Sequence, residues 1–309
     1  MPITPTKKIW MDGEFVDWEN ATTHVLSHTL HYGMGAFEGI RAYKTTTGVA
    51  IFRLREHMER LLRSCKILMI DVPFSLDTLC DAAVETVRVN DLTDGCYIRP
   101  LVYLGYGEMG VNPIGAPTNV IIGAWPWGAY LGADSLEKGV RMKISSWARH
   151  HPNSMPTASK TVGAYVNSCL AKVEAVKAGY DEAIMLGTDG LISECTGENL
   201  FIVRDGQLIT PPPSEAGALR GVTQSSVVKI ANDLGYAVSF EAMRRDDLYL
   251  ADEAFLTGTA AEVVPIDSID DRTVGEGKPG PITVAIQSTY FQAVRGARPA
   301  YESWLTKVF

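Results

Sequence analysis

A carboxylate inside an apolar stretch is the first feature of this chain that could take part in chemistry. Glu194 follows the apolar run 183–186 and the turn 188–190, and it precedes a second apolar run, 200–203. This pattern predicts a β-hairpin with Glu194 at the edge of a hydrophobic layer. A buried carboxylate is costly unless a cation or several hydrogen-bond donors meet it. Glu194 therefore needs a partner, and an ion pair or a hydrogen-bonded structural role explains it as simply as a functional one.

Two short glycine-containing turns could bind an anion. One is Arg220-Gly221-Val222-Thr223 before an expected helix, and the other is Thr257-Gly258-Thr259-Ala260 after an expected strand. Exposed amides at a helix start bind phosphate, and glycine permits close approach. For each turn alone, helix capping or tight-turn geometry is the simpler explanation. The sequence has no P-loop and no dinucleotide fingerprint, which argues against ATP or NAD.

A lysine and an arginine have residue types suited to binding or catalysis. Lys160 stands among small residues before an expected helix, where the helix dipole disfavours a cation, yet a solvated lysine is the simpler interpretation. Arg60 lies on an expected helix, where a surface ion pair would explain it. Tyr97 and Arg99 alternate along an expected strand and so share one face. Aromatic residues could line a pocket, although core packing explains each more simply, namely Tyr32, Phe37, Tyr97, Trp127 and Tyr130.

The candidate residues must be positioned by helices and strands, which we expect to alternate along the chain. Apolar periodicity and turn residues predict a hairpin over 8–16, helices over 54–70, 75–90, 161–178 and 222–234, and strands over 96–103, 119–124, 140–145 and 253–256. The Gly- and aromatic-rich stretch 125–135, broken by Pro126, is the best candidate for a linker that packs beside a ligand site.

Composition narrows the class of protein. The 309 residues carry a net charge of −8 and are 46% apolar and 21% charged, which is typical of a globular protein and argues against general nucleic-acid binding. No stretch is apolar enough to span a bilayer or to act as a signal peptide. Five scattered cysteines favour a reducing, cytoplasmic setting, and no group of residues has metal-ligand spacing.

Six ordered segments together resemble the branched-chain amino acid aminotransferases, which are class IV enzymes that use pyridoxal 5′-phosphate. The resemblance covers nearly the whole chain and is nearest to the bacterial biosynthetic form. It rests on His31-Tyr32-Gly33-Met34-Gly35-Ala36-Phe37-Glu38-Gly39-Ile40-Arg41, Tyr97-Ile98-Arg99-Pro100, residues 109–113, residues 124–132, residues 193–201, and Gly258-Thr259-Ala260-Ala261-Glu262.

The resemblance implies an α/β (α+β) fold of type IV, similar to D-amino acid aminotransferase. We expect a smaller domain over 1–124, an interdomain loop over 125–136, and a larger domain over 137–309 that carries the cofactor lysine. The family pattern also implies a homodimer at least, with a trimer of dimers left open, in which Tyr32 and Val111 reach the site of the other subunit. No nucleic-acid or membrane partner is expected.

The resemblance also implies a role for each candidate residue in the cofactor site. Lys160 is similar to the lysine that binds the cofactor covalently and moves a proton. Glu194 is similar to the carboxylate that pairs with the pyridine nitrogen. Tyr165 resembles the residue that hydrogen-bonds the ring oxygen. The phosphate cup is expected to comprise Arg60, Val222, Thr223 and Thr259.

Substrate binding follows from the same resemblance. The amides of Thr259 and Ala260 are expected to receive the α-carboxylate. Arg99, beside Tyr97, is expected to bind the distal carboxylate of glutamate. An apolar side chain would be surrounded by Phe37, Tyr130 and Tyr165. The implied reaction exchanges the amino group of leucine, isoleucine or valine with 2-oxoglutarate, which is the last step of branched-chain amino acid biosynthesis.

Four residues depart from the family pattern, and three rival functions stay open. Arg220 replaces Pro or Asp and is expected to face solvent, Val222 replaces Ile, and Cys195-Thr196 replaces smaller residues. The rivals are a D-amino acid or (R)-amine aminotransferase, aminodeoxychorismate lyase, and a non-catalytic dimeric binding protein.

Overall fold

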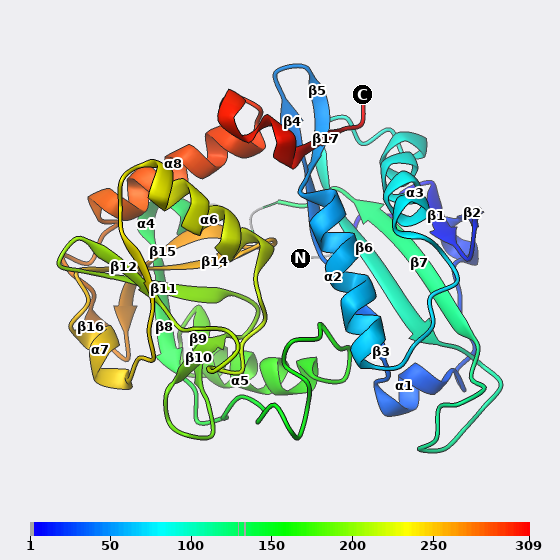
Figure 1. The fold of residues 1–309 in the computed structure, drawn as a ribbon, viewed down its shortest axis with the longest axis horizontal. Helices are drawn as coiled ribbons and strands as arrows, with labels where there is room; N and C mark the ends of the chain where they lie inside the picture. Colours follow the sequence, from blue (N-terminus) through cyan, green and yellow to red (C-terminus); the bar gives the residue numbers. More distant parts are fainter. Residues whose placement is uncertain (1–2, 129, 133) are drawn as a thin grey trace. The chain divides into compact units, whose positions relative to one another are not determined.

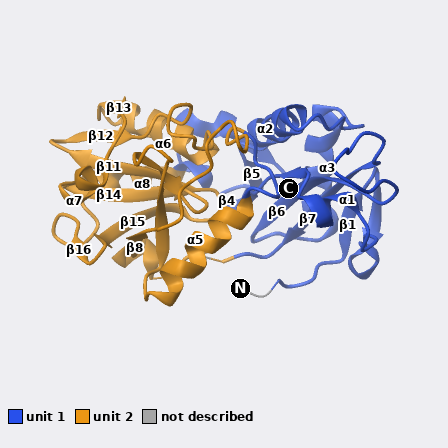
Figure 2. Ribbon diagram, turned by 90° about the horizontal axis from the view of Figure 1, so that it is seen from below, with its two compact units in different colours: residues 1–127, 159–164, 293–309 blue, residues 128–158, 165–292 orange. Residues whose placement is uncertain are grey.

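The computed structural model describes residues 3–128, 130–132 and 134–309, which divide by their contacts into two units (Figure 2). Unit 1 comprises residues 1–127, 159–164 and 293–309, of which the structure describes those from 3 onward, and unit 2 comprises residues 128–158 and 165–292. Each unit is built on its own β-sheet (Figure 1). Residues 129 and 133 of the predicted interdomain loop lie outside the described residues.

The sheet of unit 1 has eight strands among the described residues, all paired antiparallel. Its order is β17-β5-β4-β6-β7-β1-β2, and β3 pairs with the second half of β6. The strands are β1 (Lys8–Met11), β2 (Glu14–Asp17), β3 (Gly35–Phe37), β4 (Ile40–Thr45), β5 (Gly48–Phe52), β6 (Gly95–Leu104), β7 (Thr118–Trp125) and β17 (Leu305–Lys307). The predicted 8–16 hairpin and the strands predicted over 96–103 and 119–124 are therefore confirmed.

Two amphipathic helices of unit 1 bury their apolar faces in the core beside this sheet. They are α2 (Leu54–Ile67) and α3 (Leu76–Val89), near the ranges predicted from periodicity. Ser75 caps α3 by accepting a hydrogen bond from the Thr78 amide at 3.1 Å. Unit 1 also contains α1 (His28–Tyr32) and two 3₁₀ helices, η1 (Trp18–Asn20) and η2 (Pro299–Trp304).

The segment that carries Lys160 pairs with a strand of unit 1 instead of starting a helix. The Phe37 amide donates to the Lys160 carbonyl at 3.1 Å, and the Val162 amide donates to the Gly35 carbonyl at 2.9 Å. Helix α5 begins only at Tyr165 and ends at Lys177, so the prediction of helix from residue 161 was wrong. Backbone pairing with β3 occupies the polar groups that a helix would have used.

The sheet of unit 2 is mixed and has nine strands among the described residues. Its order is β10-β9-β8-β15-β14-β11-β12-β13, with β16 beside β15. The strands are β8 (Val140–Ile144), β9 (Glu182–Leu186), β10 (Ile192–Cys195), β11 (Asn199–Arg204), β12 (Gln207–Thr210), β13 (Val238–Phe240), β14 (Glu253–Gly258), β15 (Glu262–Ile269) and β16 (Arg272–Thr273). Phe201 and Phe255 face each other across β11 and β14 with ring centroids 5.1 Å apart. The predicted hairpin is present, and Glu194 lies on its second strand, β10.

Helices of unit 2 include α5 and α6 (Val222–Asp233), of which α6 matches its predicted range. The remaining helices are α4 (Ser135–Lys138), α7 (Arg245–Tyr249) and α8 (Pro281–Val294). No helix in the described part of the chain is long and apolar enough to cross a membrane.

The contact-defined units divide the chain differently from the predicted domains. The change from unit 1 to unit 2 after residue 127 falls inside the predicted loop 125–136, whereas residues 159–164 and 293–309 have their contacts in unit 1. The domain boundaries 1–124, 125–136 and 137–309 stay a prediction.

Candidate active site

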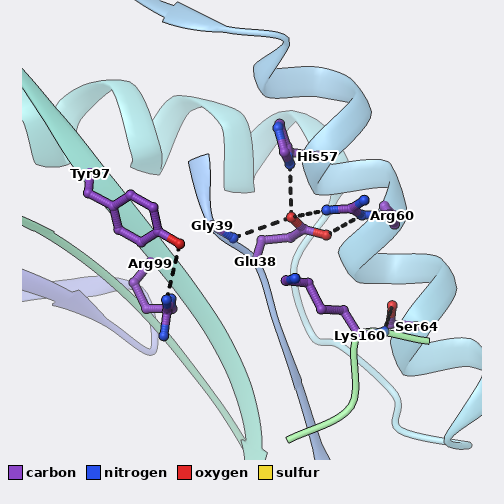
Figure 3. A network of polar contacts seen from close by, with 8 residues as sticks. All are labelled: Glu38, Gly39, His57, Arg60, Ser64, Tyr97, Arg99 and Lys160. Atoms are coloured by element: carbon purple, nitrogen blue, oxygen red, sulfur yellow. Dashed lines mark hydrogen bonds and ion pairs between the residues drawn. The ribbon is translucent and has the colours of Figure 1, made fainter. Parts of the chain in front are cut away.

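Unit 1 contains a fully buried carboxylate that binds an arginine and a histidine of α2 (Figure 3). The Arg60 guanidinium donates from Nε to Oε1 of Glu38 at 2.6 Å and from Nη2 to Oε2 at 2.8 Å. His57 Nδ1 lies 2.8 Å from Oε2 of the same carboxylate. His57 and Arg60 are three residues apart on α2 and so share the face that meets Glu38. Glu38 therefore fixes the direction of the Arg60 side chain.

Charge and burial act in opposite directions on this cluster. Burial alone would raise the pKa of Glu38, but Arg60 and His57 more than offset it and hold that pKa well below its ordinary value. Burial lowers the pKa of His57 and outweighs the raising effect of the Glu38 carboxylate, and the positive charges of Arg60 and Lys160 add to the lowering. The cluster is therefore an ionised carboxylate, a guanidinium and a neutral imidazole that donates from Nδ1.

Lys160 is half-buried and held through its backbone. Its amide donates to Ser64 Oγ of α2 at 3.0 Å, and its ammonium nitrogen lies 5.2 Å from the centroid of the Phe37 ring. Figure 3 shows the Lys160 side chain extending from this segment on the side of α2 that carries Arg60 and His57. The lysine thus lies among charged groups, not as the solvated residue that its sequence context suggested.

Tyr97 and Arg99 on β6 form a second polar group in unit 1. Arg99 Nη2 donates to Tyr97 Oη at 3.1 Å, and the Arg99 guanidinium lies over the Phe37 ring at 4.8 Å. Arg99 Nε is buried without a hydrogen-bond partner among the described residues. Gly39 makes room for this pair, because a Cβ there would come within 1.9 Å of Tyr97 Oη. The pair can receive an anionic group of a ligand.

Glu194 of unit 2 forms an ion pair with Arg149. Its Oε1 lies 2.7 Å from Arg149 Nη2, and its Oε2 accepts a hydrogen bond from the Leu219 amide at 3.0 Å. Arg149 Nη1 in turn donates to Ser168 Oγ at 3.1 Å. Glu194 and Arg149 are both buried. The carboxylate keeps two further lone-pair positions, so it can still accept a proton donor from a ligand.

The loop before α6 is tied to the same carboxylate. Leu219 donates to Glu194, and the Leu219 carbonyl accepts a hydrogen bond from Asn199 Nδ2 at 3.0 Å. Gly221 lies so close to Asn199 that a Cβ would come within 2.0 Å of Oδ1. Gly221 is the N-cap of α6 and makes no side-chain capping bond, so the amides of Val222 and Thr223 begin the helix without a side-chain acceptor from that residue.

The unusual Cys195-Thr196 pair has a structural role. Thr196 Oγ1 donates at 2.7 Å to Oε1 of Glu182, a fully buried carboxylate whose Oε2 lies 2.7 Å from Lys172 Nζ. Burial raises the pKa of the Cys195 thiol, and nearby carboxylates add to that effect. Cys195 is therefore an unreactive core residue, and Thr196 stabilises a buried charge. Arg220 is exposed, in agreement with the expectation that it faces solvent.

The predicted residues divide between the two units. Unit 1 holds Phe37, Arg60, Tyr97, Arg99 and Lys160, whereas unit 2 holds Glu194, Val222, Thr223, Tyr165, Tyr130, Thr259 and Ala260. Thr223 and Val222 are buried, and Tyr165, Thr259 and Ala260 are half-buried. Tyr32 and Val111 are 44% and 90% exposed. The roles given to all these residues stay predictions.

Sequence reasoning missed five residues that hold these groups, namely Glu38, His57, Ser64, Arg149 and Asn199. Glu38, between β3 and β4, and Asn199, at the start of β11, stand inside the quoted motifs and could have been found as polar residues beside apolar runs. His57, Ser64 and Arg149 have no local signal, because each contacts a residue at least 19 positions away.

Comparison with known proteins gives the family. The model of amino-transferase class IV matches residues 35–269. The chain belongs to the class IV aminotransferases. This class IV aminotransferase is 47% identical to the branched-chain-amino-acid aminotransferase of Pseudomonas aeruginosa, with 97% of each chain covered. It is 49% identical to that of Escherichia coli K12, with 98% of this chain and 99% of that one covered.

A solved structure of the Escherichia coli branched-chain amino acid aminotransferase is similar throughout. Its TM-score is 0.96 at 48% identity, with 98% of this chain and all of that one covered. A solved branched-chain amino acid aminotransferase with pyridoxamine 5′-phosphate has the same TM-score at 50% identity, and both chains are covered completely. The predicted resemblance to branched-chain amino acid aminotransferases and the predicted α/β fold of type IV are thereby confirmed for this class IV aminotransferase.

Proposed function

We propose that this class IV aminotransferase is a pyridoxal 5′-phosphate-dependent branched-chain amino acid transaminase. It moves the amino group of L-leucine, L-isoleucine or L-valine to 2-oxoglutarate, reversibly, and yields the branched 2-oxo acid and L-glutamate. This is the last step of branched-chain amino acid biosynthesis. The observation that carries the proposal is the 47–49% identity, over nearly all of the chain, to enzymes named for this reaction.

The polar groups of the chain fit the cofactor. A phosphate dianion needs a guanidinium and N–H or O–H donors, and Arg60, the first amides of α6 and the Thr223 hydroxyl have that chemistry. A protonated pyridine nitrogen needs a buried carboxylate, and Glu194 is one that Arg149 holds in place. The Thr257 hydroxyl on β14 is buried without a partner among the described residues, which leaves a donor for a bound group near Thr259.

Each residue then has one task. Pyridoxal phosphate, when bound, supplies an electron sink for negative charge at the substrate Cα. Lys160 would hold the cofactor covalently at rest, and its amine would carry a proton between the substrate Cα and the C4′ carbon of the cofactor. Glu194 holds the proton on the ring nitrogen. Tyr165 donates a hydrogen bond to the ring oxygen, and the phosphate is bound by Arg60, Val222, Thr223 and Thr259.

One pocket must accept both an apolar and an acidic side chain. The amides of Thr259 and Ala260 receive the α-carboxylate of either substrate. Aromatic rings of Phe37, Tyr130 and Tyr165 surround a branched apolar side chain. Arg99, oriented by its hydrogen bond with Tyr97, binds the distal carboxylate of glutamate.

We further propose that the enzyme works in the cytoplasm as a homodimer at least. Tyr32 and Val111 are apolar residues with 44% and 90% exposure, which supports their predicted contact with another subunit. Five free cysteines support a reducing compartment. Mixing a Lys160→Ala chain with a Val111→Asp chain tests the dimer, since mixed dimers should regain activity in one site. Failure of any mixture to regain activity would oppose it.

Half-reaction spectra with a panel of L- and D-amino acids test the function. We expect L-leucine, L-isoleucine, L-valine and L-glutamate to convert the bound cofactor to its amine form. Faster conversion by D-alanine would favour a D-amino acid aminotransferase, and release of pyruvate from aminodeoxychorismate without an amino acceptor would favour the lyase. A protein that stays colourless after pyridoxal phosphate is added would favour a non-catalytic role. Lys160→Ala should lose both turnover and borohydride-trapped cofactor, whereas Lys66→Ala on the exposed end of α2 should lose neither.

A further inference from the structure

A buried serine of α2 contacts the lysine segment directly (Figure 3). Ser64 has no exposed surface, and its Oγ accepts a hydrogen bond from the Lys160 amide at 3.0 Å. Its carbonyl accepts a longer bond from Ser159 Oγ at 3.4 Å. Ser64 therefore meets two consecutive residues of a segment that is almost a hundred positions away in the sequence.

The opposite side of the Lys160 peptide is held by β3. The Phe37 amide donates to the Lys160 carbonyl at 3.1 Å, and Ala36 forms an isolated antiparallel bridge with Thr161. Both backbone polar groups of Lys160 are thus bonded, the carbonyl to a strand and the amide to a helix side chain. Loss of the Ser64 hydroxyl would leave the amide without this partner in a buried setting.

Helical spacing connects Ser64 to the phosphate-binding arginine. Arg60 lies four residues before Ser64, so the two share one face of α2, and Glu38 fixes the Arg60 side chain on that face. One rigid helix consequently holds the backbone of Lys160 at one turn and the guanidinium of Arg60 at the previous turn. The spacing between these two groups is set by α2 itself.

We propose that Ser64 is a positioning residue for Lys160. This inference rests on the proposed function, because it assumes that Lys160 binds the cofactor covalently. Ser64 holds this segment through the Lys160 amide and the Ser159 hydroxyl and takes no part in proton transfer. Its hydroxyl holds the lysine where the amine meets the aldehyde carbon of the cofactor, and it thereby raises the effective concentration of the amine.

The two forms of the cofactor separate this role from a general effect on packing. Pyridoxal phosphate bonds covalently to Lys160, whereas pyridoxamine phosphate carries an amine and makes no such bond. Both forms use the same phosphate and ring contacts. A displaced Lys160 therefore weakens binding of the aldehyde form alone.

The experiment compares Ser64→Ala with the wild type and with Thr86→Val. Thr86 is a buried residue of α3 in unit 1 whose hydroxyl donates to the Ala82 carbonyl at 2.6 Å, so the control also removes a buried helix hydroxyl. Dissociation constants of the aldehyde and amine forms are measured for each apoprotein, together with the fraction of chain trapped by borohydride. For Ser64→Ala we expect the dissociation constant of the aldehyde form to rise about fivefold, on the scale of one hydrogen bond. The dissociation constant of the amine form should stay unchanged.

Each outcome decides the proposal. Unchanged affinity for the aldehyde form, or an equal loss for both forms, would overturn the positioning role. The same selective loss in Thr86→Val would also overturn it. If Ser64→Ala does not fold, Ser64→Cys replaces it, because a thiol is a poorer acceptor of similar shape, and a smaller selective loss is expected. A wild-type protein that binds neither form would instead refute the proposed function.

Discussion

Arg149 and Glu194 form a buried ion pair in unit 2, with 2.7 Å between Nη2 and Oε1. The sequence showed that the Glu194 carboxylate needed a cation, and the structure supplies one from the protein. This pair and the Leu219 amide fix the direction of the carboxylate. A ring nitrogen that approaches Glu194 therefore meets an acceptor that is already oriented.

Removal of Arg149 should therefore impair Glu194. We expect Arg149→Met to lower kcat at least tenfold and to destabilise the fold by about 3–5 kcal/mol, since it leaves a buried charge unpaired. Glu194→Gln should retain the cofactor but lose most turnover. The neutral amide of glutamine would stabilise the proton on the ring nitrogen less well than a carboxylate does. The double variant should be more stable than Arg149→Met alone. Denaturant unfolding and steady-state kinetics measure both effects.

Arg141→Met is the matched control, because Arg141 pairs with Asp271 at 3.5 Å on the surface. Exposed pairs of this kind contribute about 0–1 kcal/mol. Equal losses in the two arginine variants would contradict a special role for Arg149.

Glu38 should control cofactor affinity through Arg60. Glu38→Gln keeps the shape of the side chain but removes its charge and turns one acceptor oxygen into a donor, so Arg60 loses one of its two bonds. We expect weaker binding of pyridoxal phosphate and of inorganic phosphate, and a loss of about 2–4 kcal/mol of unfolding free energy. Equilibrium dialysis of the apoprotein and urea unfolding test this.

Glu59→Gln provides the comparison for Glu38→Gln. Glu59 lies on the same helix and pairs with Arg63 at 3.0 Å on a largely exposed surface. Its replacement should change stability by less than about 1 kcal/mol and leave phosphate affinity unchanged. Wild-type phosphate affinity in Glu38→Gln would refute the prediction.

His57 should make the fold sensitive to mild acid. Its pKa is lowered in the folded protein, mainly by burial, so the unfolded chain binds more protons below the ordinary value near 6.5. Its contribution to stability is therefore complete above pH 6.5 and declines as the pH falls below it, by at most about 1.4 kcal/mol per pH unit. Glu38, whose pKa is also lowered, adds a further decline below its ordinary value of 4.5.

Unfolding free energies between pH 7 and pH 5 measure this effect. His57→Gln should flatten the decline between pH 6.5 and pH 5, whereas His31→Gln, at an exposed histidine, should leave it unchanged. An identical slope in wild type and His57→Gln would show that other groups cause the acid sensitivity.

Gly39 should influence the choice between acidic and apolar substrates. A Cβ at this position would come within 1.9 Å of Tyr97 Oη, and the Tyr97 ring is stacked against Trp127 with centroids 5.0 Å apart. The hydroxyl must therefore move away from its bond with Arg99. We expect Gly39→Ala to raise KM for glutamate and 2-oxoglutarate about tenfold, on the scale of one charged hydrogen bond. Leucine serves as the internal control, and an equal rise in its KM would contradict the prediction.

Local patterns predicted the elements that carry the site but not the contacts between them. The apolar periodicity of α2 and α3 was sufficient to place both helices, because this signal lies within a few residues. The start of α5 was misplaced by four residues, since Thr161 and Val162 pair with β3, which is more than a hundred positions away.

The residues of the site were likewise predicted only where a local or family pattern marks them. Glu194 was recognisable as a buried carboxylate, and the family pattern marked Lys160 and Arg60. Arg149, His57 and Ser64 could not be recognised, because an arginine, a histidine or a serine gives no local sign of a distant partner. Tertiary contacts alone determine which of these residues orient the reactive groups.

The pairing of the Lys160 segment with β3 has a consequence for the order of folding. Ala36 and Thr161 lie 125 positions apart, and closing so long a loop costs conformational entropy that shorter contacts do not. We therefore expect the α2–α3 pair and the β6–β7 hairpin to form first during refolding, and the segment around Lys160 to dock late. The chain would then gain its ability to capture the cofactor aldehyde only after most of its secondary structure is present, and stopped-flow absorbance should lag behind far-ultraviolet circular dichroism.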